Sequence, residues 1–230
     1  MIGKIIVITG ASSGIGFKTA EITQELGATV VWASRNIEKD ENVLRALSEK
    51  SLVKNLDVSK ESSVVEFFDF VKDKHPKVDA IINCAGFVIP EVMYNTSLEN
   101  WSKTIDINLT GTFLMSKYGT KLMKDKGGKL INIASTAGLT PRPGWGAYAA
   151  AKSGVISLST AISEELKDYN IKVYIICPGR TATPLRTILA PDEDPTTIMQ
   201  PKAVSDFIVM CLNDVANVIE GQPLIVRERF

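Results

Sequence analysis

Lys4-Ile5-Ile6-Val7-Ile8, followed at once by Thr9-Gly10-Ala11-Ser12-Ser13-Gly14-Ile15-Gly16, is the stretch that decides the fold. The unbroken apolar run is typical of a strand buried on both faces of a parallel sheet. A glycine-rich turn and the start of a helix follow it. Glycines let the backbone approach a pyrophosphate, and the N–H groups of a helix N-terminus favour its negative charge. The stretch therefore predicts a dinucleotide-binding turn, although a plain strand, turn and helix remains the alternative.

Apolar runs and helical patterns alternate along the rest of the chain. We predict strands at 4–8, 29–33, 52–55, 78–83, 129–134, 172–177 and near 223–226. We predict helices at about 15–26, 38–49, 60–74, 99–125, 147–169 and 201–213. Strands that alternate with helices imply right-handed crossovers and a parallel sheet covered on both faces. The expected fold class is therefore α/β with a doubly wound parallel sheet.

Length and composition exclude several classes of protein. A chain of 230 residues with 45% hydrophobic residues fits one globular domain over 1–230. The formal net charge is zero, which gives no reason to expect nucleic acid or an anionic membrane as a partner. No apolar run approaches the ~18 residues of a membrane span, and the first strand begins so early that we expect no signal peptide.

The metal-binding and redox-active residue types are sparse. Cys84, Cys177 and Cys211 are odd in number and widely spaced, and His75 is the single histidine. This pattern predicts neither a disulfide framework nor a metal site, and it favours a cytoplasmic location.

One irregular stretch interrupts the alternation at 178–200. It contains Pro178, Pro184, Pro191 and Pro195 and an acidic run at 192–194. Because a long loop in a compact domain is usually functional, we expect a lid over the substrate at about 181–200. A disordered surface insert is the alternative.

Small or polar residues follow each of the first six predicted strands on the side where such sheets bind ligands. After the glycine-rich turn, these are Ser34-Arg35-Asn36, Asp57-Val58, Asn83-Cys84-Ala85-Gly86, Ser135 and Pro178-Gly179. A purely structural sheet does not need this arrangement at each strand. We therefore expect these residues to line one ligand site.

The end of the second strand bears on the choice of cofactor. An acidic residue there would bond the ribose hydroxyls of NAD, whereas an arginine suits the 2′-phosphate of NADP. This chain has Ser34-Arg35 and no carboxylate, and Ser12 or Ser13 can add a hydroxyl. The pattern predicts NADP(H) over NAD(H), unless Arg35 merely begins a solvated helix.

Tyr148 and Lys152 are four residues apart in a predicted helix, so they lie on one face. A nearby positive charge favours a phenolate and lowers the pKa of a tyrosine. A tyrosine tuned in this way can exchange a proton with a carbonyl or an alcohol at neutral pH. By itself the pair is weak evidence, because the spacing also occurs on solvated helices.

Taken together, these motifs resemble those of the short-chain dehydrogenase/reductase family. The resemblance rests on Thr9-Gly10-x-x-x-Gly14-x-Gly16, Asn83-Cys84-Ala85-Gly86, Asn108, Ser135, Tyr148-x-x-x-Lys152 and Pro178-Gly179, in the family's order and spacing. It implies a single Rossmann-like domain with a seven-stranded sheet in three α/β/α layers. It also implies a homotetramer or homodimer built on the two long helices.

The resemblance assigns roles to individual residues. Tyr148 would be the general acid or base, Lys152 would lower its pKa and bond the nicotinamide ribose, Ser135 would hold the substrate oxygen, and Asn108 would anchor a relay water. The residues expected to contact the cofactor are Gly10, Ser12, Ser13, Gly14, Ile15, Gly16, Ser34, Arg35, Asp57, Val58, Asn83, Ala85, Gly86, Tyr148, Lys152, Pro178, Gly179 and Thr183.

The implied function is an NADP(H)-dependent oxidoreductase that interconverts a ketone or aldehyde with an alcohol, with 3-oxoacyl compounds among the candidate substrates. A non-enzymatic NADP(H)-binding sensor is the first alternative. A sugar-nucleotide epimerase or dehydratase is the second, although only about fifty residues follow the sixth strand, too few for its substrate domain.

The expected substrate pocket has a largely apolar mouth, to which Arg142 could attract an anionic group. The apolar residues are Ala137, Leu139, Trp145, Ile188 and Leu189. Two positions depart from the family pattern. Cys84 stands where a second asparagine is common, and Arg227-Glu228-Arg229-Phe230 replaces a glycine-rich tail, which leaves one pocket wall undetermined.

Overall fold

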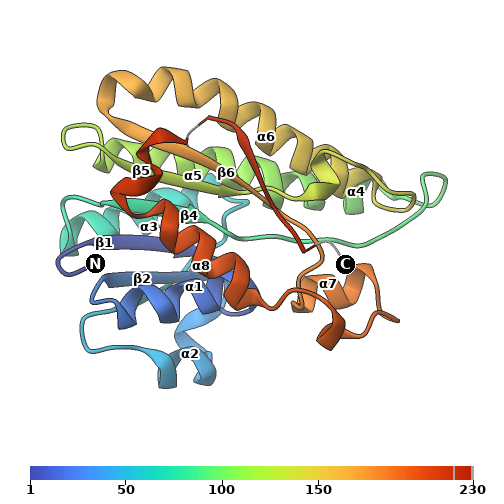
Figure 1. Cartoon of the computed structure of the whole chain (residues 1–230), viewed down its shortest axis with the longest axis horizontal. Helices are drawn as coiled ribbons and strands as arrows, with labels where there is room; N and C mark the ends of the chain where they lie inside the picture. The colour runs from blue at the N-terminus through green and yellow to red at the C-terminus, as the bar shows by residue number, and fades with distance from the viewer. Residues whose placement is uncertain (220, 229–230) are drawn as a thin grey trace.

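Seven parallel strands form one sheet in the computed structural model, which describes residues 1–219 and 221–228 (Figure 1). In chain order they are β1 (Ile5–Thr9), β2 (Thr29–Ser34), β3 (Leu52–Asn55), β4 (Ala80–Asn83), β5 (Gly128–Ile133), β6 (Ile171–Pro178) and β7 (Pro223–Val226). Across the sheet the order is β3-β2-β1-β4-β5-β6-β7. The direction of winding reverses between β1 and β4, where sheets of this kind bind ligands. The predicted doubly wound parallel sheet is therefore confirmed.

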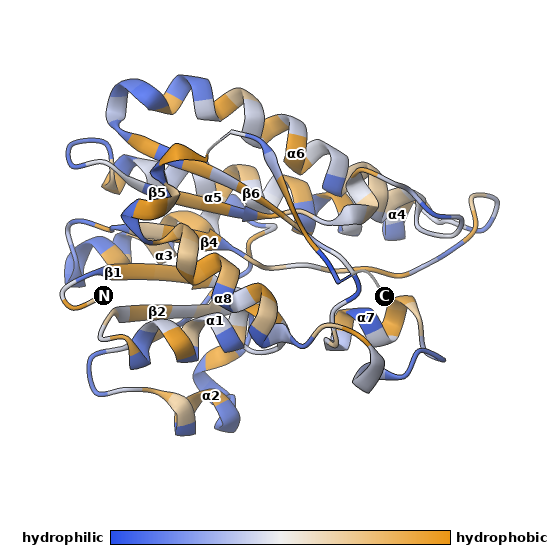
Figure 2. Ribbon diagram, in the orientation of Figure 1, coloured by the Kyte–Doolittle hydropathy of each residue, from blue (hydrophilic) through white to orange (hydrophobic). Residues whose placement is uncertain are grey.

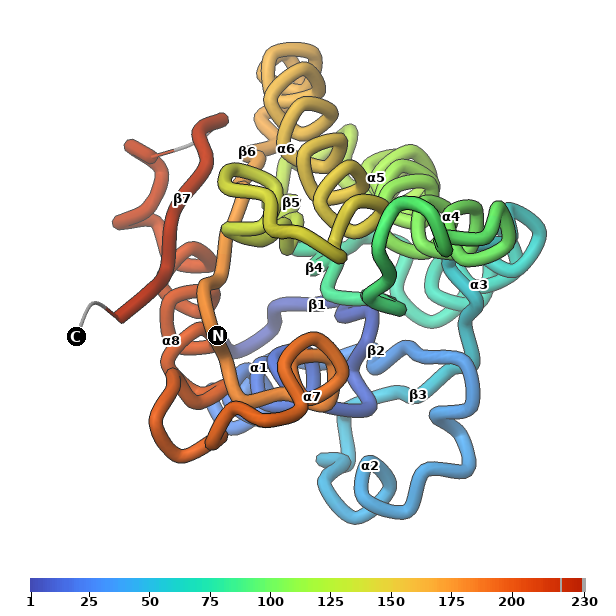
Figure 3. Tube along the Cα trace, turned by 90° about the vertical axis from the view of Figure 1, so that its right-hand side faces the viewer, coloured from blue at the N-terminus to red at the C-terminus, as the bar shows by residue number. Residues whose placement is uncertain are grey.

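Helices cover both faces of the sheet, as the view along the strands shows (Figure 3). One face carries α1 (Gly14–Glu25) and α8 (Pro201–Cys211), which pack against each other. The other face carries α3 (Glu61–Lys74), α4 (Leu98–Ile105), α5 (Gly111–Gly119) and α6 (Gly146–Leu166). The short helix α2 (Glu41–Ala46) lies at the edge near β3, and α7 (Pro184–Leu189) lies at the carboxyl ends of the strands.

Apolar strand residues alternate between two cores. Ile6 and Ile8 of β1 join Trp32 in the core under α1 and α8, whereas Val7 joins Phe67 in the core under α3 and α5. Figure 2 shows the strands as mostly hydrophobic, with hydrophilic residues on the outer sides of the helices. Burying one such side chain contributes about 1.5–3 kcal/mol. The continuous apolar run at 4–8 thus reflects a strand that is covered on both sides.

Two predicted helices are shorter or more divided than expected. The helix predicted at 38–49 is a 3-10 turn at Ile37–Lys39 followed by α2. Asp40 separates them in an extended conformation, and its carboxylate accepts hydrogen bonds from the N–H groups of Asn42 and Val43. The helix predicted at 99–125 consists of α4, a π-helical turn at Asp106–Thr110, and α5.

The stretch at 178–200 is not wholly irregular, because α7 lies within it. Thr183 caps this helix by accepting a hydrogen bond from the Arg186 N–H, and Pro184 occupies its first turn. The two ends of the stretch meet in a parallel bridge between Thr181 and Met199, where the Ala182 N–H donates to the Met199 carbonyl at 2.8 Å.

Within residues 1–219 and 221–228, all three cysteines are free and no cluster of potential metal ligands occurs. No helix in this part of the chain has the length and apolar character needed to cross a membrane. Of the atypical C-terminal residues, Arg229 and Phe230 lie outside the described part.

Candidate active site

A cavity of about 370 Å³ opens at the carboxyl ends of the strands, on both sides of the reversal point. Its walls come from the turns after β1, β2, β3, β4, β5 and β6, from the start of α6, and from α7. Its size lies within the range of small-molecule and cofactor sites. The turns after these six strands therefore line one common cavity, where the sequence predicts a single ligand site.

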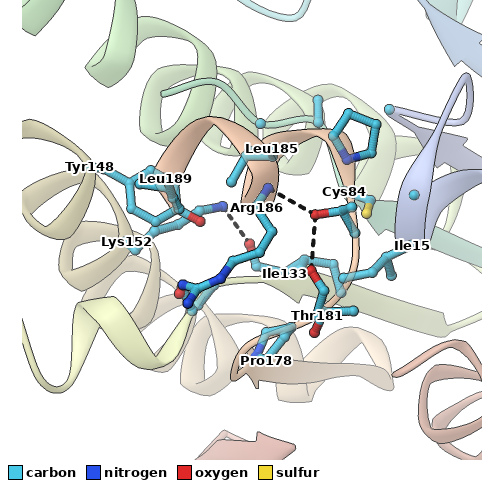
Figure 4. A pocket seen from close by; sticks show the side chains of 18 of the residues that line it. Ile15, Cys84, Ile133, Tyr148, Lys152, Pro178, Thr181, Leu185, Arg186 and Leu189 are labelled. Atoms are coloured by element: carbon cyan, nitrogen blue, oxygen red, sulfur yellow. Dashed lines mark hydrogen bonds between the residues drawn. The ribbon is translucent and has the colours of Figure 1, made fainter. Parts of the chain in front are cut away.

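Tyr148 and Lys152 enter the cavity from the first turns of α6 (Figure 4). Both are buried, with 7% and 4% of their surface exposed. The Lys152 Nζ lies 5.7 Å from the centre of the Tyr148 ring and donates a hydrogen bond to the Ile133 carbonyl at 2.8 Å. That bond ties the lysine to the end of β5 and fixes its position beside the phenol.

Burial dominates the protonation of both groups. It raises the pKa of Tyr148 to about 12, against the opposing effects of the Ser135 hydroxyl and the Arg186 guanidinium. It lowers the pKa of Lys152 to about 8. The pKa of Tyr148 is therefore raised in this structure, whereas the sequence predicts a lowered value. Removing the phenol from water outweighs the nearby positive charge, to which Arg186 contributes.

Ser135 lies directly after β5 and lines the cavity with Tyr148. Its backbone is extended, and its hydroxyl accepts a hydrogen bond from the Ala137 N–H at 3.1 Å, which caps a short 3-10 turn at Thr136–Gly138. The same hydroxyl interacts with the Tyr148 phenol. A serine hydroxyl and a tyrosine phenol thus face one point of the cavity, from β5 and α6 respectively.

Asn108 lies in the π-helical turn between α4 and α5 and is fully buried. Its amide group donates to the carbonyls of Phe87 and Thr104 at 2.7 and 2.8 Å, and its oxygen accepts from the Phe87 N–H at 3.3 Å. The side chain therefore holds the segment after β4 against the helix, and π-helical turns often mark functional sites.

The glycine-rich turn forms the opposite end of the cavity. Gly10 has a φ of +64°, and a Cβ there would lie 2.9 Å from the backbone of Ala85. Beyond this turn, the hydroxyl oxygens of Ser12 and Ser34 are 3.2 Å apart, and Arg35 and Asp57 line the wall beside them.

Electrostatics at this end are mixed in sign. Burial alone would raise the pKa of Asp57, but hydrogen bonds from Ser59 and the charges of Lys60 and Arg35 bring it below its usual value. Asp57 is therefore an anion that can accept hydrogen bonds, and Arg35 is a cation close enough to act on it.

The cavity brings together most of the residues that the sequence singles out. Those on its wall are Gly10, Ser12, Ser13, Gly14, Ile15, Ser34, Arg35, Asp57, Val58, Ala85, Gly86, Ser135, Tyr148, Lys152, Pro178, Gly179 and Thr183. Three others lie behind the wall, namely Gly16, Asn83 and Asn108.

Gly16 and Asn83 support the wall from behind. A Cβ on Gly16 would lie 2.4 Å from the Gly10 carbonyl oxygen, so glycine lets α1 approach the turn. The Asn83 amide group is buried and donates to Asn132 Oδ1 at 2.8 Å, and Asn132 in turn donates to Ser159 Oγ at 2.8 Å. This chain of hydrogen bonds ties β4 and β5 to α6.

The expected apolar mouth is only partly present. Ala137, Trp145 and Leu189 line the cavity, and Val88 and Leu185 pack with them around Tyr148. Leu139, directly after the 3-10 turn, and Ile188, on α7, do not line it and are exposed.

Comparison with known proteins identifies the family of this chain. The family model described as short chain dehydrogenase matches residues 4–194, which contain all four predicted catalytic residues. This chain belongs to the short-chain dehydrogenase family. It is accordingly an oxidoreductase that acts on CH–OH groups, and the family binds a nicotinamide cofactor.

Individual relatives of this short-chain dehydrogenase differ in their cofactors. A protein of Listeria innocua named NAD-dependent glycerol dehydrogenase is 30% identical over 97% of this chain and 92% of its own. One of Lentilactobacillus kefiri, named NADP-dependent (R)-specific alcohol dehydrogenase, is 32% identical over 80% of this chain and 75% of its own. The solved 3-ketoacyl-(acyl-carrier-protein) reductase of Brucella melitensis, complexed with NADH, superposes with a TM-score of 0.90 at 28% identity, covering 98% and 97% of the two chains.

The short-chain dehydrogenase structure fits a nicotinamide dinucleotide. At Gly10 the cavity floor has no room for a Cβ. Within the described residues, the N-cap residue of α1, Ser13, makes no side-chain hydrogen bond to the first turn, which leaves N–H groups there available to a pyrophosphate. Ser12, Ser13 and Gly14 would hold that pyrophosphate. Asp57 and Val58 would meet the adenine, and Lys152 would meet the nicotinamide ribose.

Sequence reasoning missed several basic and apolar residues of the cavity of this short-chain dehydrogenase. The missed wall residues include Arg180, Thr181, Leu185, Arg186 and Arg227. The first four lie in or beside the stretch that was expected to be an irregular lid. Its proline at 184 after a capping Thr183 is a helix-start signal that could have indicated α7.

Proposed function

We propose that this short-chain dehydrogenase is an NADP(H)-dependent enzyme that interconverts a ketone or aldehyde with the corresponding alcohol, with Tyr148 as the proton donor or acceptor. The observation that carries the proposal is the meeting of the Tyr148 phenol, the Ser135 hydroxyl and the Lys152 ammonium at one end of a single cavity. The alternative of a non-enzymatic sensor has no support in the comparisons.

Tyr148 is suited to give a proton to a carbonyl oxygen. Because burial raises its pKa to about 12, the phenol is protonated throughout the neutral range. A protonated donor is the form that carbonyl reduction requires, and the reverse reaction uses the same oxygen as the acceptor. When bound, the nicotinamide nucleotide supplies or accepts the hydride at the carbon atom.

Ser135 and Lys152 support this proton transfer. The Ser135 hydroxyl can donate a hydrogen bond to the same substrate oxygen, which stabilises the negative charge that develops there. Lys152 offers a positive charge to the phenolate that forms as Tyr148 loses its proton. Asn108 holds the segment after β4 in place, and it is the expected anchor of a water that relays protons to Lys152.

We expect the rate of reduction to depend on pH through Lys152. With a pKa lowered to about 8, the side chain is an ammonium below that pH and a neutral amine above it. The ammonium stabilises the phenolate that forms in the transition state, so kcat/KM for reduction should fall as the pH rises through about 8. A pH profile with NADPH, from about pH 6 to about pH 10, measures this.

The matched variant is Lys152→Arg, since a guanidinium stays charged over the whole range. Its profile should lack the decline near pH 8, whatever its absolute rate. A wild-type profile that is flat across this region, or an unchanged decline in the arginine variant, would contradict the assignment to Lys152.

The preference for NADP(H) rests on the end of β2. Arg35 lies on the cavity wall beside the paired hydroxyls of Ser12 and Ser34. Together they offer a charged, planar donor and two hydroxyls to a phosphate. The nearest acidic residue on the wall, Asp57, already accepts two hydrogen bonds from Ser59.

Replacing Arg35 with glutamine should lower kcat/KM with NADPH by about 10- to 100-fold, because a hydrogen bond to a charged group contributes roughly 1.5–3 kcal/mol. Efficiency with NADH should change little, since NADH lacks the phosphate. Steady-state kinetics with both cofactors measure the ratio, and Lys39→Gln, an exposed cation on the next turn, is the control. A wild-type enzyme that is clearly more efficient with NADH would refute the preference.

A further inference from the structure

Three arginines gather around one glutamate at the substrate end of the cavity. Arg186 on α7 donates from Nε and Nη2 to the two carboxylate oxygens of Glu193, at 2.5 and 2.8 Å. Arg180 Nη1 lies 3.4 Å from the same carboxylate. Arg142 acts on it from a greater distance, and the combined effect of the three lowers the pKa of Glu193, chiefly through the bonds from Arg186. The group therefore carries two positive charges in excess.

These arginines belong to the substrate end of the cavity. The guanidinium carbons of Arg142 and Arg186 lie 5.5 and 5.6 Å from the Trp145 ring. Trp145 packs beside Tyr148 together with Leu185 and Leu189. Arg186 is also close enough to the phenol to lower its pKa, and Figure 4 shows its side chain extending into the space in front of Tyr148. The start of α1, where a pyrophosphate would bind, lies against Thr183 at the N-terminus of α7, because a Cβ on Gly14 would be 3.0 Å from the Thr183 side chain.

The three arginines differ in how many of their guanidinium donors already have a carboxylate partner. Arg186 is largely buried, with 12% of its side chain exposed, and its Nε and Nη2 groups already donate to Glu193. Arg180 shares that carboxylate at a longer distance and is half-exposed. Within residues 1–219 and 221–228, Arg142 has no carboxylate within ion-pair distance, although it lines the cavity. Two guanidinium groups therefore have donors available toward the cavity.

We propose that the substrate of this enzyme carries an anionic group, a carboxylate or a phosphate, which Arg142 and Arg180 bind at the cavity mouth while its carbonyl lies at Tyr148 and Ser135. The proposal rests on the function proposed above. A cleft lined by charge of one sign concentrates ligands of the opposite sign, and guanidinium groups pair well with planar or tetrahedral oxyanions. Arg186 and Glu193 act as positioning residues, since their pair fastens the segment after α7, while Arg142 and the half-exposed Arg180 keep donors available to the cavity.

The test compares matched substrates with and without the charge. A series of linear oxo carboxylic acids, lengthened by one methylene at a time, is assayed with NADPH against the corresponding carboxamides. A second arm compares dihydroxyacetone phosphate with dihydroxyacetone, so that the two arms distinguish a carboxylate from a phosphate. At least one acid or phosphate should exceed its neutral partner in kcat/KM by at least about tenfold, mainly through a lower KM.

The double variant Arg142→Gln/Arg180→Gln should bring that ratio close to one, because glutamine keeps polarity and loses the charge. Lys202→Gln, which removes an exposed cation on α8 that does not line the cavity, should keep the wild-type ratio. Neutral substrates that react as well as or better than the charged ones in the wild type would overturn the proposal. So would a charge preference that survives in the double variant.

If the proposed function itself is wrong, no NADPH will be consumed with any probe, charged or neutral, and the result can be told apart from a failure of the anion site. Binding then decides the present inference, because a ligand that binds the folded protein raises its Tm. A rise in Tm with an oxo acid or dihydroxyacetone phosphate that is lost in the double variant supports the anion site. No rise, or an equal rise in both proteins, overturns it.

Discussion

Replacing Tyr148 with phenylalanine is expected to lower kcat for carbonyl reduction by about 10³-fold or more, while the Kd for NADPH stays within about threefold. Phenylalanine keeps the ring that packs against Val88 and Ala137, so the wall of the cavity is preserved. Only the hydroxyl is lost, and with it the proton that the carbonyl oxygen receives. Single-turnover reduction and fluorescence titration of NADPH separate the two effects.

A matched control is Tyr94→Phe, because Tyr94 is 99% exposed and does not line the cavity. It should retain the wild-type kcat and Kd. If Tyr148→Phe kept full turnover, the phenol would not be the proton donor. The proposed roles of Ser135 and Lys152, which depend on that proton transfer, would then be refuted as well. If it lost NADPH binding as well, the loss of activity would not identify a chemical role.

Replacing Gly10 with alanine should weaken NADPH binding by about 30-fold or more and also lower the Tm. The φ of +64° disfavours any side chain, and the new Cβ would lie 2.9 Å from the Ala85 backbone, which is not free to move aside. Overpacking costs about 1–3 kcal/mol, and a left-handed conformation adds roughly 1 kcal/mol. Because this turn would hold the pyrophosphate in the proposed function, relief of the strain would change the surface that the cofactor meets.

The matched control is Gly146→Ala at the start of α6, where a Cβ would meet nothing within 4 Å. It should leave the Kd for NADPH and the Tm close to those of the wild type. Calorimetry and titration of the two variants together test the explanation. Equal effects in both would mean that the loss at Gly10 has nothing to do with the close approach to Ala85.

The fold and the glycine-rich end of the cavity could be predicted because their signals are local in the sequence. The apolar run at 4–8 requires a covered strand, and the glycines that follow it require close backbone approach. The protonation of Tyr148 could not be predicted in the same way. The spacing to Lys152 identifies a neighbour, but the pKa depends on burial, which is set by Val88, Ala137 and the residues of α7 far along the chain.

Most of the basic end of the cavity was beyond sequence reasoning for a related reason, since the sequence singled out only Arg142. Arg142 precedes α6, Arg180 follows β6, and Glu193 lies beyond α7, so their charges add up only in three dimensions. The prolines at 178–200 indicated irregular structure, whereas the cap at Thr183 builds a helix there. That helix carries Arg186 toward Glu193 and brings the group together.

The bridge between Thr181 and Met199 brings the two ends of the segment 182–198 together, so the segment leaves and re-enters the sheet at adjacent points. A segment closed in this way can change in sequence and length while the strands keep their register. Thr183 is the exception, because a Cβ on Gly14 of the glycine-rich turn would lie 3.0 Å from its side chain. Exchange of the segment between relatives therefore has to preserve the two bridge positions and the threonine at 183.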